Sequence, residues 1–442
     1  MRFWHISLFV LLAALGSTPK LNALEKQPAS VYHARRVALA AHLQGGVAVV
    51  FAAYEPQMEY QDYRQDEDFF YLTGWNEPGA ALLVMGEGSS YKETLFLPTR
   101  NLRLEKYTGV KLDAVTPGAA QSAGVDAVQP MTDLATTLNR LIDSDRRLLH
   151  NLWAAPSNPA SLALTGFTAM TLGLDPPPTL HDVAAPIQAL RVVKDAGEIA
   201  LLHKASDASI AAQRVMMRAV KPGVTERTLA GKMTAAWLEN GCERASYPPI
   251  VGSGINSTTL HYADNSRTME DGEVLLVDAA CEYSMYASDI TRTVPVNGHF
   301  TDRQREIYNV VLGSQQAAIS AFVAGKSKIN DRDRKDPDSL DTAAYNYINT
   351  HGKALDGAPL GKYWLHGLGH MVGIDVHDPA DYPAVLKPGM VFTIEPGVYI
   401  PEEKIGVRIE CVFLVGVDGK LIDLVADLPH TAEDVEAWMK TK

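Results

Sequence analysis

The sequence predicts an α+β protein of two domains, a smaller α/β domain followed by a larger one in which helices precede acid-bearing strands. At 442 residues the chain exceeds the length at which a single core usually keeps growing, so two domains are expected. Helical and extended patterns alternate in the first part, whereas long helices are followed by apolar strands, twice, in the second. A composition of 46% hydrophobic and 21% charged residues is that of a soluble globular chain, so neither part is expected to be disordered.

The first domain alternates one amphipathic pattern with short apolar runs. The expected order is a helix over 29–43 and then strands over 47–53, 80–85 and 94–97. Proline is densest between 175 and 186, where neither a helix nor a central strand can continue. The predicted N-terminal domain therefore covers residues 25–178, and the second domain covers 179–442.

The second domain opens with two helical patterns and repeats that order later. Thr225 is a suitable N-cap for the second helix, and Gly241 stops it. The expected helices of this domain cover 196–219, 225–241, about 303–323 and 342–350. Apolar runs that carry acids follow each pair, although no repeat is visible residue by residue.

The N-terminus has the pattern of a signal peptide over residues 1–24. Arg2 precedes the apolar stretch 6–15, and small residues such as Ala23 follow it as possible cleavage points. Cleavage would place the protein in the periplasm or outside the cell; without it the protein is expected in the cytoplasm, where the same stretch could be a short buried helix. The stretch is too short to span a bilayer, so no stable membrane insertion is expected.

The three cysteines and one charged segment predict no chemistry. Cys242, Cys281 and Cys411 are an odd, widely spaced set and do not form a disulfide framework. Cys281 and Cys411 are interpreted as apolar fillers of strands, because buried free cysteine packs as a small hydrophobe. The segment 326–338 mixes charges of both signs at high density, which favours a solvated loop.

Four acids and one histidine of the second domain carry the functional hypothesis. Each acid lies in or beside an apolar run, and like charges meeting in one cleft would repel by about 4 kcal/mol per pair at ~4 Å. Buried charges of this kind need neutralisation, pairing or cations. A donor set of hard oxygens with one imidazole and no thiolate favours two divalent ions, of which manganese is the expected one. The proposed ligands are Asp278, Asp289, His370, Glu395 and Glu410.

The order and wording of these motifs, with Leu260-His261-Tyr262, resemble the pita-bread metallopeptidases and, within them, aminopeptidase P. Tyr63-Arg64-Gln65 and the run from Asp68 to Gly74 are similar to the N-terminal domain of that family. The resemblance implies a creatinase/aminopeptidase-like catalytic domain and release of the first residue from peptides with proline second. It also implies a homo-oligomer, a dimer or tetramer. Nucleic acid is not expected as a partner, since the net charge is −12.

The same resemblance assigns roles to individual residues. Asp278 would bind one ion, Asp289 and Glu410 would bridge both, and His370 with Glu395 would complete the second. A hydroxide between the ions would attack the Xaa-Pro bond. The remaining roles concern substrate and transition state: His261 as oxyanion donor, His366 and His377 orienting the peptide, Glu395 passing a proton to the leaving nitrogen, and Arg408 orienting a carboxylate or contacting substrate.

Several alternatives stay open at this point. A prolidase would use the same centre on dipeptides, and a non-catalytic binding module would carry no metal. A creatinase-like hydrolase lacks the full acid set, and a His-Glu-x-x-His peptidase is disfavoured because no glutamate follows His366. Tyr107 stands where the resembling family has a tryptophan that reaches a neighbouring subunit, which puts the preferred substrate length in doubt.

Overall fold

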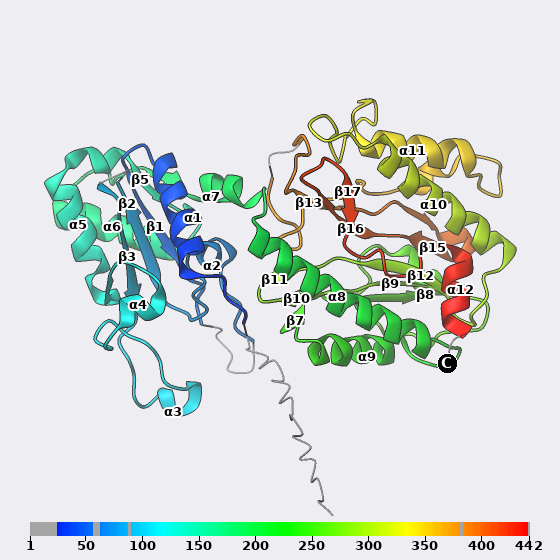
Figure 1. Ribbon diagram of the computed structural model, residues 1–442, viewed down its shortest axis with the longest axis horizontal. Helices are drawn as coiled ribbons and strands as arrows, with labels where there is room; N and C mark the ends of the chain where they lie inside the picture. The colour runs from blue at the N-terminus through cyan, green and yellow to red at the C-terminus, as the bar shows by residue number, and fades with distance from the viewer. Residues whose placement is uncertain (1–23, 56–61, 87–89, 381–382, 441–442) are drawn as a thin grey trace, which may run out of the picture.

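The computed structural model describes residues 24–55, 62–86, 90–380 and 383–440. Figure 1 shows a sheet-centred body and a larger body whose strands lie between helices, with α7 (Ala184–Arg191) between the two bodies. Apart from Leu24, the predicted signal peptide lies outside the described residues. Within the described part of the chain, no helix combines the length and the apolarity needed to cross a bilayer.

The first body is built on a mixed six-stranded sheet in the order β4-β3-β2-β1-β5-β6. In its central strand, Ala48 and Val50 face the helices α1 and α2, whereas Val47 and Val49 face α5 and α6. Both faces are covered, which explains why this strand is apolar throughout and not alternating. The strands are β1 (Val47–Phe51), β2 (Ala81–Met85), β3 (Lys92–Leu97), β4 (Val128–Pro130), β5 (Leu152–Ala154) and β6 (Leu180–Asp182). The helices are α1 (Ala29–His42), α2 (Glu67–Thr73), α3 (Glu105–Thr108), α4 (Ala119–Ala123), α5 (Leu134–Ser144) and α6 (Pro159–Leu172).

The first sheet extends past the expected boundary at 178. Gly173, in a left-handed conformation, ends α6; after the prolines the chain returns to the sheet, where β6 pairs in parallel with β5. Residues 180–182 therefore belong to the first sheet, although the predicted boundary assigns them to the second domain. A proline-rich stretch shows where a helix cannot continue, but it does not predict where the next short strand pairs.

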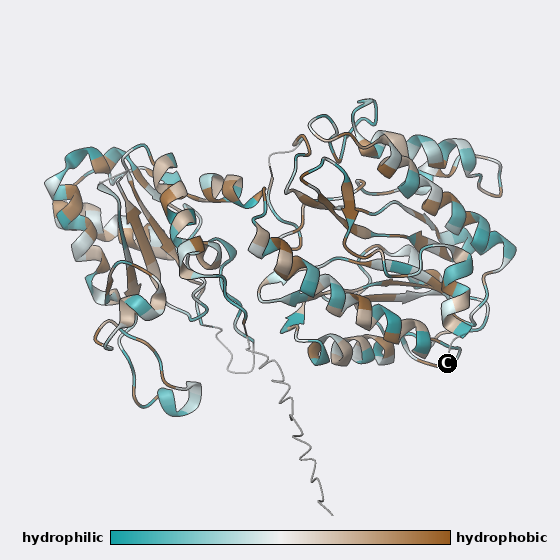
Figure 2. Cartoon of the chain, viewed as in Figure 1, coloured by the Kyte–Doolittle hydropathy of each residue, from teal (hydrophilic) through white to brown (hydrophobic). Residues whose placement is uncertain are grey.

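The second body repeats one arrangement, two helices followed by acid-bearing strands. Its helices α8 (Ala196–Ala219), α9 (Glu226–Glu239), α10 (Asp302–Ala321), α11 (Leu340–His351) and α12 (Ala432–Lys440) lie outside the strands (Figure 1). Figure 2 shows the strands as mostly hydrophobic and the outward helix faces as largely hydrophilic. The strands are β7 (Arg244–Ala245), β8 (Ile250–Ser253), β9 (Val274–Asp278), β10 (Cys281–Tyr283), β11 (Tyr286–Ala287), β12 (Thr291–Pro295), β13 (Val391–Ile394), β14 (Gly397–Ile400), β15 (Ile405–Arg408), β16 (Cys411–Val415) and β17 (Leu421–Asp423).

Antiparallel pairing brings the acid-bearing segments together. β9 lies between β8 and β12, and Asp278 pairs with Thr291, two residues after Asp289. β13 pairs with β16, and β14 with β15, so that Glu395 and Glu410 lie where the chain leaves one pair and enters the other. Each half of the second body thus delivers two carboxylates.

The prediction that the cysteines form no disulfide is wrong for one pair. Cys242 follows α9, and Cys281 begins β10; their Cα atoms lie 6.1 Å apart and their sulfurs are bonded. The two residues are separated by 39 positions, and the antiparallel pairing of β7 with β10 brings them together. Cys411 is free and buried, as expected for a strand filler.

Candidate metal centre

The predicted ligands converge from both halves of the second body. Asp278 ends β9, and Asp289 precedes β12; Glu395 follows β13, and Glu410 lies between β15 and β16. Three of these carboxylates, those of Asp278, Asp289 and Glu410, are less than a tenth exposed. Segments more than a hundred residues apart in the chain therefore present acids to one place.

His370 connects the two pairs of acids. Its Nε2 lies 3.3 Å from Asp289 Oδ2 and 3.5 Å from Glu395 Oε1, and its Nδ1 bonds the carbonyl of Met371 at 3.0 Å. Ligand atoms of Asp289, His370 and Glu410 all lie within 4.8 Å of one another. Because Nδ1 is engaged with a carbonyl, Nε2 is the nitrogen left to face a cation.

Arg408 places a guanidinium in direct contact with the acids. Its guanidinium contacts Asp278 Oδ2 at 2.6 Å, Thr291 Oγ1 at 3.0 Å and Tyr399 Oη at 2.8 Å. Burial would lower its pKa, but the surrounding negative charges keep that pKa well above its ordinary value. One guanidinium cannot balance four carboxylates, so the centre retains excess negative charge.

Burial, with repulsion from neighbouring acids, raises the pKa values of three of the candidate ligands, Asp278, Glu395 and Glu410. Desolvation raises the pKa of Asp278 and raises that of Glu395 to about 7; it also raises the pKa of Glu410 well above its usual value, with the neighbouring acids adding to the effect. Burial alone would lower the pKa of His370, but Asp289 and Glu395 outweigh it and raise that pKa to about 9. The centre thus takes up protons readily when no metal balances it.

Two observations indicate that the candidate ligands suit divalent cations. Asp278 Oδ1 is buried and has no hydrogen-bond partner among the described residues, so this oxygen is available as a ligand atom. Burial, together with repulsion from neighbouring acids, raises the pKa values of Glu395 and Glu410. Carboxylate oxygens with a single imidazole are donors that hard divalent ions accept.

The three further histidines lie around this centre in different environments. The ring of His377 stacks on that of His370 at 3.9 Å between centroids, and burial followed by the charge of His370 lowers the pKa of His377. His366 bonds Tyr399 Oη through Nε2 at 2.8 Å, and burial lowers its pKa to about 4. His261 is exposed and lies near enough to contribute to the lowered pKa values of both His366 and His377.

Hydroxyl groups that the sequence did not single out hold the acids in place. Tyr247 donates to Asp289 Oδ1 at 2.6 Å, and Thr291 donates to Glu410 Oε2 at 2.6 Å. Thr393 donates to Glu395 Oε1 at 3.2 Å. Thr291 and Thr393 could have been suspected because each lies two residues from a ligand, whereas Tyr247 comes from a distant loop and gave no signal.

The charged segment 326–338 also contacts the site, although it was expected to be only a solvated loop. The side chain of Asn330 accepts from Leu368 N at 2.7 Å and donates to Gly369 O at 2.6 Å. Arg334 donates to the carbonyl of His366 at 2.9 Å. This segment therefore holds the main chain between His366 and His370.

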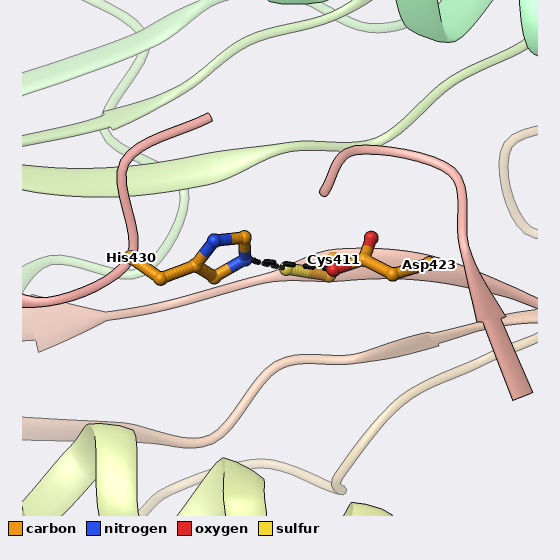
Figure 3. Close-up of side chains that lie close together, drawn as sticks. All are labelled: Cys411, Asp423 and His430. Carbon is orange, nitrogen blue, oxygen red and sulfur yellow. Dashed lines mark hydrogen bonds and ion pairs between the residues drawn. The ribbon is translucent and has the colours of Figure 1, made fainter. Parts of the chain in front are cut away.

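A second convergent group, Cys411, Asp423 and His430, lies in the core of the second body (Figure 3). His430 Nε2 lies 3.1 Å from Cys411 Sγ and 3.5 Å from Asp423 Oδ2. Nη2 of the fully buried Arg292 lies 3.1 Å from His430 Nε2 and 3.6 Å from Cys411 Sγ. A fixed guanidinium already supplies positive charge there, so this group is a hydrogen-bonded cluster and not a second metal centre.

Comparison with known proteins decides the family. The sequence model of metallopeptidase family M24 matches residues 200–416, and that of the aminopeptidase P N-terminal domain matches 32–150. The Xaa-Pro aminopeptidase of Escherichia coli (strain K12) is 33% identical over 92% of this chain and 97% of its own length. The chain belongs to metallopeptidase family M24. It is a metallo-aminopeptidase, a hydrolase.

Solved structures of the M24 family agree with this fold. A putative aminopeptidase P from Bacillus anthracis superposes with a TM-score of 0.85 at 27% identity, covering 94% of this chain and 99% of the other. The low-pH form of aminopeptidase P from E. coli gives a TM-score of 0.83 at 30% identity, over 94% and 99%. The predicted family and the pita-bread fold with an N-terminal α/β domain are confirmed.

Proposed function

We propose that this metallo-aminopeptidase releases the N-terminal residue from peptides with proline at the second position, using two divalent ions. The observation that carries the proposal is the convergence of Asp278, Asp289, His370, Glu395 and Glu410 in one centre. Two relatives that match the chain over nearly all of its length, from Escherichia coli and Haemophilus influenzae, are Xaa-Pro aminopeptidases by name. Such a substrate lacks an N–H at the scissile bond, so the site must accept a tertiary amide.

The five residues would hold the ions in the arrangement that the resemblance implies, with Asp289 and Glu410 shared between them. Manganese is the proposed metal, because the donors are mainly carboxylate oxygens. When bound, the two ions would supply an activated water as nucleophile at neutral pH and polarise the scissile carbonyl.

The protein's own side chains would handle protons and orientation. A carboxyl of Glu395 whose pKa lies near 7 is suited to pass a proton to the leaving proline nitrogen. His261 would donate to the oxyanion, and its exposure places it where a peptide can reach it. His366 and His377 would orient the peptide; both have lowered pKa values and so remain neutral donors or acceptors near pH 7.

The deciding experiment measures metal content and hydrolysis of an Xaa-Pro-Yaa tripeptide before and after chelation. We expect two ions per chain, loss of activity on chelation and recovery with Mn²⁺. Parallel assays of an Xaa-Pro dipeptide separate the alternatives: cleavage of the dipeptide alone would indicate a prolidase. Absence of both metal and activity would indicate a binding module and contradict the proposal.

We further propose export and self-association. The Cys242–Cys281 disulfide supports export, because such bonds persist in oxidising compartments such as the periplasm. A homo-oligomer, a dimer or tetramer, is supported by exposed apolar side chains on the segment around α3, among them Leu102, Tyr107 and Val115. N-terminal sequencing of the natural protein and light scattering in solution test these two points.

A further inference from the structure

Two buried glutamines, one in each half of the second body, bond to the main chain beside the candidate ligands. Gln213 lies on α8, and its Nε2 donates to the carbonyls of Ala279 at 3.1 Å and Ile290 at 3.2 Å. These two residues directly follow Asp278 and Asp289. A single amide group therefore joins the two strands that carry the first pair of acids.

Gln315 on α10 makes the corresponding contacts in the other half. Its Nε2 donates to the carbonyls of Ile394 at 3.0 Å and Ile409 at 3.1 Å. These residues directly precede Glu395 and Glu410. A glutamine amide that donates to two carbonyls beside the acids thus occurs in both halves, although the two helices show no visible sequence repeat.

The contacts lie where the paired strands change partners. The N–H of Ala279 bonds the carbonyl of Ile290 at 3.1 Å, beyond the last paired residues of β9 and β12. In the second half, the chain passes from the β13–β16 pair to the β14–β15 pair between Ile394 and Gly397. A side chain that donates to both carbonyls adds a further link between the two segments at these points.

Burial of these amides has a cost that packing alone does not explain. Gln213 is 0% exposed and Gln315 is 2% exposed. The Oε1 of Gln213 has no hydrogen-bond partner among the described residues, so its burial carries an unpaired acceptor. An apolar side chain of similar volume would fill the position without that cost, which indicates that the two N–H donors are what the position requires.

We propose that Gln213 and Gln315 are positioning residues that set the separation of the carboxylates within each pair, Asp278 with Asp289 and Glu395 with Glu410. This inference rests on the proposed two-ion centre. Removing either amide leaves two buried carbonyls with fewer donors and allows the acid-bearing strands to separate. Loss of a group that supports metal ligands typically weakens metal affinity by about 10–100-fold.

The test uses full-length protein with Gln213→Leu or Gln315→Leu, titrated in metal-free form with Mn²⁺ by calorimetry. We expect each variant to bind at least one of the two ions roughly 10-fold or more weakly. Gln304→Leu is the matched control, since Gln304 is also buried and also donates to a carbonyl, that of Gly272, away from the acids. That control should lose stability but keep its Mn²⁺ affinity.

The outcomes distinguish failure of the proposed two-ion centre from failure of the positioning role. Unmodified protein that fails to bind two ions contradicts the proposed centre itself. Two ions bound normally by both glutamine variants, or an equal loss in Gln304→Leu, overturns the positioning role alone. Near-ultraviolet circular dichroism of the metal-free proteins checks folding; if the leucine variants do not fold, Gln213→Met and Gln315→Met, with unbranched side chains of similar length, are titrated instead.

Discussion

At the scale of single residues, the centre is defined by charges that cannot all be present without cations. Burial and neighbouring acids raise the pKa values of Glu395 and Glu410, and two acids raise that of His370 to about 9. The metal-free site therefore holds protons where an ordinary surface group would have lost them. Metal and protons compete for the same atoms.

This competition predicts how pH acts on the metal-free protein. Glu395 and His370 bind protons more tightly folded than unfolded, so the stability they contribute is present at low pH and lost as pH rises through their folded pKa values of about 7 and about 9. We expect the metal-free Tm to fall between pH 6 and pH 8. Mn²⁺ affinity should rise over the same interval, roughly tenfold per pH unit for each proton displaced. Calorimetry in two buffers would reveal the proton release, and an affinity independent of pH would contradict it.

His261→Ala tests a single hydrogen-bond donor. If His261 stabilises the developing oxyanion, its loss should lower kcat by about 100-fold and change KM little. Steady-state kinetics on an Xaa-Pro-Yaa tripeptide provide the measurement. A variant that raises KM while kcat stays unchanged would place His261 in substrate binding instead.

At the scale of elements, strands and loops determine which residues become partners. The candidate acid ligands were predictable because each lies in or beside an apolar run, and α8, α10 and α11 were predictable because their periodicity is clear. The supporting residues were not predictable: Tyr247 contacts Asp289, and Gln213 contacts the main chain beside the acids, each across a long stretch of chain. The local sequence pattern predicts which face of a helix or strand is buried. It does not predict which residue of another element that face contacts.

The segment 326–338 provides an element-scale prediction. Asn330 bonds both Leu368 N and Gly369 O, so Asn330→Ala would release the main chain that presents His366 and His370. We expect kcat/KM to fall roughly tenfold, as for other losses behind a metal ligand. Lys335→Ala, an exposed change in the same segment, is the control and should behave as the unmodified enzyme. Equal activity of both variants would show that the segment is only a solvated loop.

At the scale of the whole molecule, covalent and ionic links join distant segments. The Cys242–Cys281 disulfide closes a loop of 39 positions, and a loop of this length should stabilise the fold by roughly 3–4 kcal/mol. Urea unfolding of the Cys242→Ser variant against the unmodified protein measures the difference. A free energy of unfolding that is unchanged would mean that the bond constrains the unfolded chain little.

A buried ion cluster joins the two bodies. Arg191, at the end of α7, contacts Asp68 on α2 and Asp378 in the second body, each at 2.6 Å; Lys194 contacts Asp378 at 2.7 Å. Asp378 and Lys194 are each 1% exposed at the side chain. Burial acts against the charged form, but the two cations outweigh it and lower the pKa of Asp378. Asp378 follows His377, so the cluster links the N-terminal body to the edge of the metal centre.

Removing Asp378, which Arg191 and Lys194 share, should therefore lower the free energy of unfolding far more than removing a surface ion pair would. Asp378→Ala leaves two buried cations with one acid, Asp68, still in contact, and such losses destabilise by about 3–5 kcal/mol. Asp68→Ala is the matched comparison, because Arg191 then keeps Asp378 as a partner; its loss should be the smaller of the two. Urea unfolding of both variants gives the order. If Asp68→Ala proved the more damaging, the contact with α2, and not the acid beside His377, would hold the two bodies together.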